Sequence, residues 1–161
     1  MVRIPILMVN EGRGIVGELE LEARPGDGRL YVDGGLFCDE QAHAALRTAF
    51  SLLRADRDVL IRRNVRGEDV HCLCGASLGL AVYLGMYALL NGCEIAPNVF
   101  VTGGLDGEGK VTAVGGLAEK MRAVVDRAKR LIVPAGQGLP LAGIEVVEVS
   151  TVEEAVHACF G

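Results

Sequence analysis

A serine flanked by small residues lies near the middle of the chain, in the segment Gly75-Ala76-Ser77-Leu78-Gly79. The pattern places it after an expected strand and at the start of an expected helix. A helix N-terminus has unpaired backbone N–H groups and partial positive charge, which stabilise an oxyanion, and small neighbours let a substrate backbone approach. The same position suits a helix cap, whose hydroxyl only satisfies the helix end. For Ser77 both interpretations, nucleophile and cap, are open at this point.

A lysine near the start of a later helix supplies the base that a serine nucleophile needs. Lys120 follows the segment Gly115-Gly116-Leu117-Ala118-Glu119. A lysine acts as a general base when desolvation and the positive end of a helix dipole lower its pKa toward neutrality. The alternative is a solvated side chain that pairs with an Asp or Glu. Ser77 and Lys120 together indicate a candidate serine–lysine pair.

A glycine-rich cluster, Gly104-Leu105-Asp106-Gly107-Glu108-Gly109-Lys110, matches the core of a phosphate-binding loop. Such a loop needs Ser or Thr next, because that hydroxyl holds Mg²⁺, and it opens a helix. Here Val111 follows, and the cluster lies between two expected strands. Asp106-Gly107 between apolar runs is typical of a β-hairpin. We therefore expect a hairpin, and no nucleotide cofactor.

The cysteines and histidines lack the spacing of a metal site. Cys72 and Cys74 follow His71, but a structural zinc site takes four ligands, usually from paired motifs. On a strand, Cys72 and Cys74 share one face, where we expect them to behave as small hydrophobic residues. The five cysteines of the chain show no disulfide framework. We therefore expect no metal, and a reducing compartment such as the cytoplasm.

The composition predicts one folded domain over residues 1–161. Hydrophobic residues make up 50% of the chain and charged residues 23%, which is typical of a globular protein. The net charge of -5 and the aromatic content of 4% argue against nucleic-acid and anionic-membrane partners. No apolar run reaches the roughly 20 residues of a membrane span. The first residues also lack the pattern of a secretory signal.

Hydrophobic periodicity predicts the elements that must position these residues. The expected strands are 3–9, 15–23, 29–32, 58–62, 69–73, 99–102, 110–114, 131–133 and 145–149. The expected helices are 40–53, 77–90, 117 to about 130, and a last helix opened by the capping box Ser150-Thr151-Val152-Glu153. Strands come first, and helices and strands then alternate. This order predicts an α+β or mixed α/β domain.

Three stretches of the chain resemble the proteolytic domain of Lon proteases, which use a Ser-Lys dyad. They are Pro25-Gly26-Asp27-Gly28-Arg29-Leu30 with Gly34-Gly35-Leu36 and Glu40-Gln41-Ala42; Ser77-Leu78-Gly79; and Val101-Thr102-Gly103 with Lys110-Val111-Thr112-Ala113-Val114-Gly115-Gly116-Leu117-Ala118-Glu119-Lys120. The family's nucleophile falls on Ser77 and its catalytic lysine on Lys120, at the separation that the family has. Leu131-Ile132-Val133-Pro134 and the closing helix follow the family's order, so the resemblance covers nearly the whole chain.

The resemblance implies the Lon proteolytic α+β fold, which is related to the second domain of ribosomal protein S5. It implies that Ser77 attacks the scissile carbonyl and that Lys120 is its general base. Thr102 would orient the lysine. The backbone of Gly75, Ala76 and Ser77 would form the oxyanion hole. Lon proteases form hexameric rings, so the resemblance also implies a homo-oligomer.

The chain departs from the family pattern in three respects. Cys74 stands where the family has Asp, in a shortened loop before Ser77; Gly104 replaces the family's Glu; and there is no room for the ATPase module. We therefore expect an ATP-independent endopeptidase that cuts unfolded or extended polypeptides, or an endopeptidase whose substrates are delivered by a separate ATPase or unfoldase. The alternative is a weak or inactive Lon-like domain that serves in assembly. A small-molecule kinase of related fold would need the phosphate loop that the sequence lacks.

Overall fold

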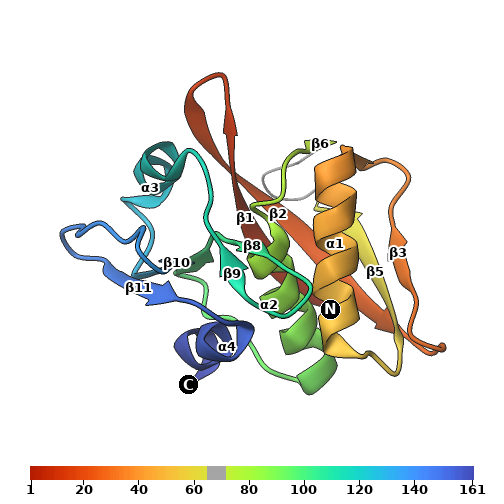
Figure 1. Cartoon of the computed structure of the whole chain (residues 1–161). Helices are drawn as coiled ribbons and strands as arrows, with labels where there is room; N and C mark the ends of the chain where they lie inside the picture. Colours follow the sequence, from red (N-terminus) through yellow and green to blue (C-terminus); the bar gives the residue numbers. More distant parts are fainter. Residues whose placement is uncertain (65–71) are drawn as a thin grey trace.

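The computed structural model describes residues 1–64 and 72–161 (Figure 1). Its strands are β1 (Val2–Asn10), β2 (Arg13–Arg24), β3 (Leu30–Val32), β4 (Phe37–Cys38), β5 (Asp58–Arg63), β6 (Cys72–Leu73), β7 (Val99–Val101), β8 (Gly104–Leu105), β9 (Val111–Thr112), β10 (Arg130–Pro134) and β11 (Glu145–Val149). Its helices are α1 (Glu40–Leu53), α2 (Gly79–Asn91), α3 (Leu117–Val124) and α4 (Val152–Phe160). The architecture is mixed α/β, consistent with the expected α+β class.

The larger sheet has four strands in the order β1-β2-β5-β3. The β1–β2 pair is a long antiparallel hairpin, β5 runs antiparallel to β2, and β3 runs parallel to β5. The predicted alternation of β2 is confirmed, because Leu19 and Leu21 are fully buried. On the opposite face Glu20 pairs with Arg3 of the neighbouring strand at 3.4 Å. The sheet therefore has one apolar face that a helix layer must cover.

Helix α2 fills the centre of the molecule and covers that face. Most of its residues are buried, and it contacts α1, β1, β2 and α4. Gly85 permits close packing, because a Cβ there would lie 2.7 Å from Cδ1 of Leu21 and 3.2 Å from Cβ of Ile4. The helix ends as predicted, with Gly92 in the left-handed conformation (φ 68°). No helix among the described residues, α2 included, has the length and apolar character to cross a bilayer.

A second sheet has three parallel strands in the order β11-β10-β7. In Figure 1 it lies to the left, with α3 above it and α4 below it. Two smaller pairs complete the strands: β4 and β6 are parallel, and β8 and β9 are antiparallel. The predicted hairpin is confirmed by the β8–β9 pair. Asp106 stabilises its turn by accepting hydrogen bonds from the N–H groups of Glu108 and Lys110, both at 2.9 Å.

Helix α3 is shorter than the pattern predicts. It ends at Val124, whereas the sequence predicts a helix to about Arg130. The N–H groups of Lys129 and Arg130 donate to the carbonyl of Asn98, at 2.9 and 3.2 Å, which draws the backbone out of the helix and into β10. Tertiary hydrogen bonds with the segment before β7 thus override a local helical pattern.

Other element boundaries also move by a few residues. Helix α4 is capped by Thr151, whose Oγ1 accepts from the N–H of Glu154 at 3.2 Å, so the N-cap lies one residue later than the predicted capping box places it. Strands β7 and β9 are shorter than predicted. Of the strand expected at 69–73, Cys72–Leu73 is confirmed, and 69–71 lie outside the described residues.

Candidate active site

The loop that joins β6 to α2 carries Ser77. Gly75 within it has a left-handed backbone (φ 81°), which a side chain would strain. The carboxylate of Asp39 accepts hydrogen bonds from the N–H of Gly75 at 3.1 Å and from the N–H of Ala42 at 2.8 Å. Because Asp39 is the N-cap of α1, its side chain ties the start of α1 to the loop before Ser77.

Ser77 is half-buried and lies two residues before α2. The N-cap of α2 is Leu78, and no side chain caps this helix, so the interpretation of Ser77 as a helix cap is wrong. Among the described residues, the structure gives no hydrogen-bond partner to the Ser77 hydroxyl or to the N–H groups of Ala76 and Ser77. The Ser77 hydroxyl and these two N–H groups therefore have no acceptor within the described part of the chain.

The segment that follows β7 contains Thr102 and Gly103, and it contacts the backbone of Ser77. The N–H of Gly103 donates to the carbonyl of Ser77 at 3.1 Å, and the carbonyl of Gly103 accepts from the N–H of Leu80 at 2.9 Å. Thr102, one residue earlier, is 1% exposed, and its N–H donates to the carbonyl of Ile132 in β10 at 3.0 Å. The start of α2 and the smaller sheet together fix this segment.

Lys120 lies in the first turn of α3 with its side chain 3% exposed. Its Nζ donates to Oγ1 of Thr102 over 3.5 Å, the long end of the hydrogen-bond range. Among the described residues, no carboxylate lies within ion-pair distance of Nζ. Burial lowers the pKa of Lys120 from its ordinary value of 10.5, because the charged form loses its hydration. The alternative of a solvated, ion-paired lysine is therefore wrong.

The β1–β2 hairpin holds the N-terminal end of α3. A Cβ at Gly14 would lie 2.1 Å from the carbonyl oxygen of Glu119, so the strand touches the helix backbone. Gly116, the N-cap of α3, has φ 65°, and a Cβ there would lie 2.6 Å from Cγ2 of Val9. These two glycines let α3 approach the hairpin closely, and the helix carries Lys120 into its buried position.

Gln137 fixes the segment that leads into α3. Its side-chain amide accepts from the N–H of Val114 and donates to the carbonyl of Val114, both at 2.9 Å. This two-bond arrangement imitates a neighbouring strand. Because Val114 directly precedes Gly115 and Gly116, the side chain of Gln137 restrains the approach to the helix.

Sequence reasoning misses Asp39, Gln137 and Gly14 as positioning residues. An Asp directly before an expected helix is an N-cap signal, so the capping role of Asp39 was accessible from the pattern. The contacts of Asp39 with Gly75, of Gln137 with Val114 and of Gly14 with α3 join residues far apart in the chain. No local sequence pattern predicts such contacts.

The cysteines before the loop differ from expectation. Cys72 and Cys74 are both exposed, so the prediction that they pack as small hydrophobic residues is wrong. The physical reason is that β6 is only two residues long and pairs with the equally short β4. Residues 1–64 and 72–161 contain no group of three or more His, Cys, Asp or Glu side chains that could hold a metal ion. His71 lies outside the described residues.

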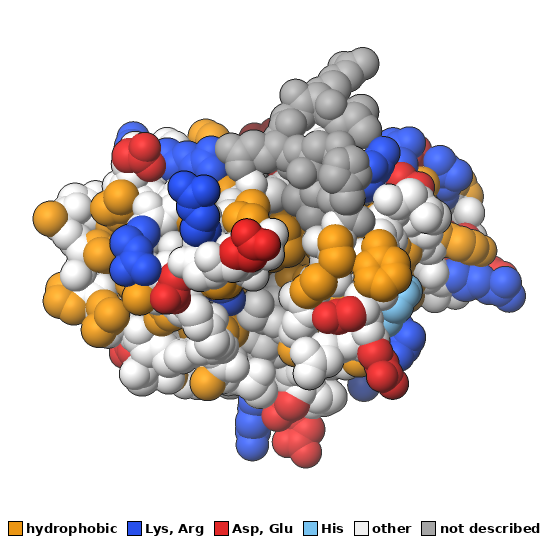
Figure 2. Space-filling model, turned by 90° about the horizontal axis from the view of Figure 1, so that it is seen from above, with side chains coloured by type: hydrophobic (Ala, Val, Ile, Leu, Met, Phe, Trp, Pro, Cys, Tyr) orange, Lys and Arg blue, Asp and Glu red, His pale blue; other side chains and the backbone are white. Residues whose placement is uncertain are grey.

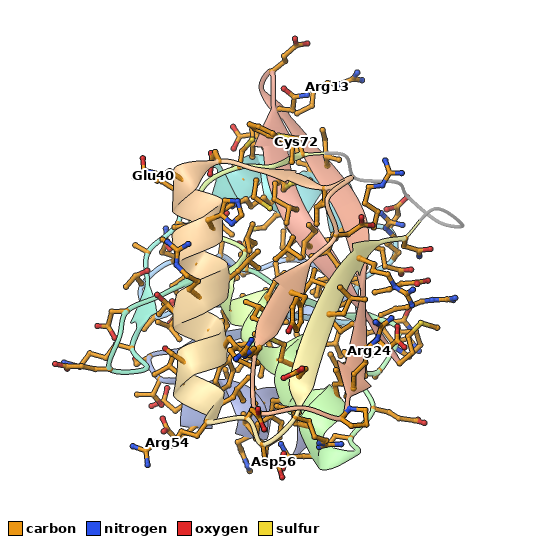
Figure 3. All side chains as sticks on the ribbon, turned by 90° about the vertical axis from the view of Figure 1, so that its right-hand side faces the viewer. Arg13, Arg24, Glu40, Arg54, Asp56 and Cys72 are labelled. Atoms are coloured by element: carbon orange, nitrogen blue, oxygen red, sulfur yellow. The ribbon has the colours of Figure 1, made fainter. Side chains whose placement is uncertain are left out.

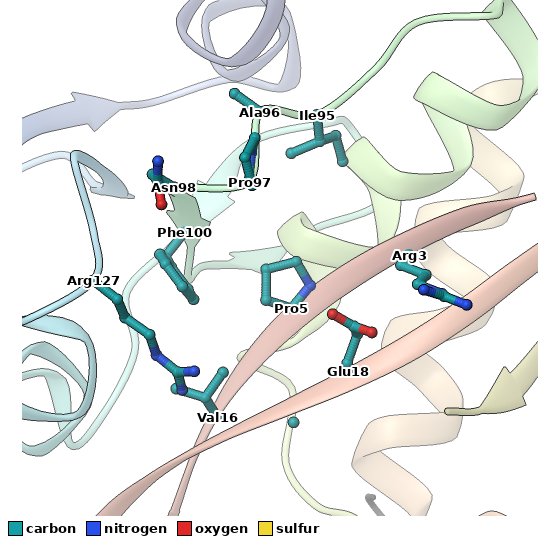
Figure 4. Close-up of a pocket in the computed structure, with 11 residues that line it drawn as sticks. Arg3, Pro5, Val16, Glu18, Ile95, Ala96, Pro97, Asn98, Phe100 and Arg127 are labelled. Atoms are coloured by element: carbon teal, nitrogen blue, oxygen red, sulfur yellow. The ribbon is translucent and has the colours of Figure 1, made fainter. Parts of the chain in front are cut away.

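A pocket of about 480 Å³ lies between the β1–β2 hairpin and the segment that precedes β7 (Figure 4). The guanidinium of Arg127 lies over the ring of Phe100 at one wall, 5.7 Å from its centroid. None of the candidate residues Ser77, Thr102 and Lys120 lines this pocket. The site near Ser77 is thus separate from it.

Comparison with known proteins gives one consistent result. The family model of the Lon protease (S16) C-terminal proteolytic domain matches residues 12–146. Lon protease of Neorickettsia sennetsu is 27% identical over 157 residues, which cover 86% of this chain and 19% of the relative. Lon protease of Xanthomonas oryzae pv. oryzae is 31% identical over 130 residues, which cover 74% of this chain and 15% of the relative. The chain therefore spans less than a fifth of the length of these relatives. Since the family model covers most of the sequence, this chain belongs to the family of Lon protease (S16) C-terminal proteolytic domains.

Proposed function

We propose that this chain is a serine peptidase with Ser77 as nucleophile and Lys120 as general base. Family membership supports a protease. The observation that carries the dyad is the buried Nζ of Lys120, 3.5 Å from Oγ1 of Thr102. Thr102 adjoins Gly103, whose N–H binds the backbone of Ser77. One short segment therefore contacts both members of the proposed dyad.

The proposed mechanism uses a neutral Lys120. As Oγ of Ser77 attacks the scissile carbonyl carbon, its proton passes to Nζ of Lys120. Lys120 then gives that proton to the leaving amine, and an ester between Ser77 and the substrate forms. Water attacks this ester with Lys120 again as the base, which frees Ser77. Thr102 is a positioning residue that orients Nζ.

We assign the oxyanion to the N–H groups of Ala76 and Ser77. Both lack an acceptor among the described residues, whereas the N–H of Gly75 already donates to Asp39. Gly75 then acts by holding the loop in shape. Removal of one oxyanion donor costs about 10²–10³-fold in kcat in a well-studied serine protease.

We propose unfolded or extended polypeptides as substrates, without a requirement for ATP. The glycine cluster forms the β8–β9 hairpin, so it supplies no phosphate loop. On the face shown in Figure 2, acidic, basic and hydrophobic side chains are interspersed. A separate ATPase or unfoldase would deliver folded substrates.

Four further expectations stay proposals. The first is that residues 1–161 act as one domain, and the second is that its fold is related to the second domain of ribosomal protein S5. The third is a hexameric homo-oligomer, which light scattering after size-exclusion chromatography would detect. The fourth is a reducing, cytoplasmic compartment, which the five free cysteines support.

Cleavage of fluorescein-labelled casein without ATP tests the dyad. Wild type is compared with Ser77→Ala and Lys120→Met, with circular dichroism as the check on folding. Each variant should lose roughly 10³-fold or more of the activity. The matched controls are Ser51→Ala, at an exposed serine of α1, and Lys110→Met, at a lysine whose side chain is 68% exposed. Both controls should cut like wild type.

The same experiment decides against the alternative of an inactive assembly domain. Folded wild type that cuts no better than Ser77→Ala between pH 6 and 10 would exclude a stand-alone peptidase. The assembly domain would then be the better description, and a binding partner the next object of search.

A further inference from the structure

Two exposed thiols lie directly before the loop that carries Ser77. Sγ of Cys72 and Sγ of Cys74 are 3.1 Å apart, and both side chains are exposed. Figure 3 places Cys72 at the end of the molecule where α1 begins at Glu40, opposite the end marked by Arg54. A third thiol, Cys38, is buried in the neighbouring strand β4.

We propose that Cys72 and Cys74 form a reversible thiol–disulfide site that controls the loop before Ser77. A low-molecular-weight disulfide, such as oxidised glutathione, would convert the two thiols into an intramolecular disulfide. Oxidation would then switch the peptidase off. The effect on activity rests on the proposed function, whereas the disulfide and its effect on the loop do not.

The geometry favours a covalent bond between these two sulfurs. A disulfide has an S–S length near 2.05 Å, so the sulfurs must approach by about 1 Å. Both side chains are exposed, so this approach does not disturb a packed core. Cys38 is less suitable, because it is buried and burial raises the pKa of its thiol. A metal ion fits less well, since the described residues offer no group of three metal-binding side chains.

The reaction balances with the small disulfide as the oxidant. The thiolate of Cys72 attacks one sulfur of oxidised glutathione, which forms a mixed disulfide and releases one glutathione thiolate. Cys74 then loses its proton to solvent, and its sulfur attacks Sγ of Cys72. The second glutathione leaves as a thiolate, and both released thiolates are protonated. The protein loses two electrons and two protons, and oxidised glutathione is reduced to two thiols.

The two thiols share one hydrogen bond, in which either sulfur can be the donor. This hydrogen bond with Cys72 raises the pKa of Cys74 to about 11, with burial and nearby acidic groups adding to the rise. Either thiol can therefore attack first, and the exchange balances in the same way with the other as the resolving thiol.

The coupling to the site runs through Gly75. Cys74 is bonded to Gly75, whose N–H is held by the carboxylate of Asp39 and whose φ is 81°. A movement of Cys74 toward Cys72 pulls on this constrained residue. Ala76 and Ser77 follow directly, and they carry the proposed oxyanion donors and the nucleophile. A displacement near 1 Å in an active site costs up to about 10²-fold in rate.

The test treats the protein with mixtures of oxidised and reduced glutathione. Intact-mass measurement should show the loss of two hydrogen atoms without a glutathione adduct, and peptide mapping should link Cys72 to Cys74. Hydrogen exchange should change at the amides of residues 75–78. Casein cleavage should fall roughly 10- to 100-fold and recover with dithiothreitol.

Variants make the assignment specific. Cys72→Ser and Cys74→Ser should keep basal cleavage and lose the response to oxidised glutathione. Cys93→Ser, at a half-buried thiol in another part of the chain, should respond like wild type. A stable glutathione adduct, a link to Cys38, or a disulfide without a change in exchange at 75–78 would overturn the proposal. If reduced wild type fails to cut casein, the proposed function fails, and the mass and exchange data still decide the disulfide site.

Discussion

At the scale of single residues, Lys120 sets the pH dependence of the proposed activity. Burial lowers its pKa from 10.5, so the neutral base appears as pH rises, at lower pH than for an exposed lysine. We expect kcat/KM for casein to rise with pH, with a midpoint below 10.5 that reports Lys120 in the free enzyme. A rate that falls or stays level between pH 6 and 10 would contradict a lysine base.

The same burial predicts a pH-dependent stability. A lysine whose pKa is lower in the folded than in the unfolded chain opposes folding while it is protonated. The free energy of unfolding should therefore rise as pH increases from the folded pKa toward the unfolded value. Lys120→Met removes this penalty, so it should be more stable than wild type near pH 7, by a margin that shrinks at higher pH. Urea denaturation of wild type and Lys120→Met, at pH 7 and at a higher pH, measures the difference in their free energies of unfolding. A difference that grows with pH would refute the argument.

Thr102 offers a second prediction at this scale. Its hydroxyl is the partner that the structure gives Nζ of Lys120 among the described residues. Thr102→Val keeps the shape and removes the hydroxyl, so kcat should fall about 10- to 100-fold, part of the 10²–10⁴-fold that a positioned base contributes. Thr102→Ser keeps the hydroxyl and should restore most of the rate. Equal losses in the two variants would point to packing instead of positioning.

At the scale of elements, the contact between the β1–β2 hairpin and α3 controls where Lys120 lies. Gly14→Ala would place a Cβ 2.1 Å from the carbonyl oxygen of Glu119, which forces the helix away from the hairpin. We expect casein cleavage to fall by up to about 10²-fold in a protein that still folds. The matched control is Gly34→Ala, where nothing lies within 4 Å of the added Cβ. Equal activity in the two variants would show that the contact does not position the base.

Element existence follows from the sequence better than element ends. Helix α1 has the predicted limits, because Asp39 caps it and its apolar face is regular. The hairpin of β1 and β2 follows from clean alternation. The start of α2 and the end of α3 differ from prediction. Hydrogen bonds between Gly103 and the residues at the start of α2, and from the N–H groups of residues 129 and 130 to the carbonyl of Asn98, decide these two limits. Motif spacing predicts Ser77 and Lys120 as the site residues, and this stays a prediction, whereas Asp39 and Gln137 act through contacts that only the fold creates.

At the scale of the whole molecule, the buried hydrophobic side chains of the described residues form two clusters. The larger joins the four-stranded sheet, α1 and α2 to the smaller sheet and α4, and it includes Met86. The smaller lies beneath α3, and it includes Met121 beside Lys120. Helix α3, which carries Lys120, is therefore supported by a cluster distinct from the one that contains α2.

A pair of methionine truncations tests this division. Met86→Ala and Met121→Ala both empty buried space, since the side chains are 0% and 3% exposed, and each should cost about 2–5 kcal/mol of unfolding free energy. Under conditions where both variants are folded, Met121→Ala should lose more activity, because Met121 anchors α3, the helix that carries Lys120. Denaturant unfolding and casein cleavage measure the two effects. Equal activity per folded molecule would mean that both clusters support the site alike.

The shared segment at Thr102 and Gly103 has a consequence for quality control. It contacts a serine from the middle of the chain and a lysine whose helix packs on the N-terminal hairpin, so the proposed dyad forms only after all these parts have packed together. An incompletely synthesised or denatured copy would then have no peptidase activity. On the proposed function, that same unfolded copy is an extended polypeptide and therefore a substrate of folded copies. Folded molecules would then degrade molecules of the same protein that fail to fold.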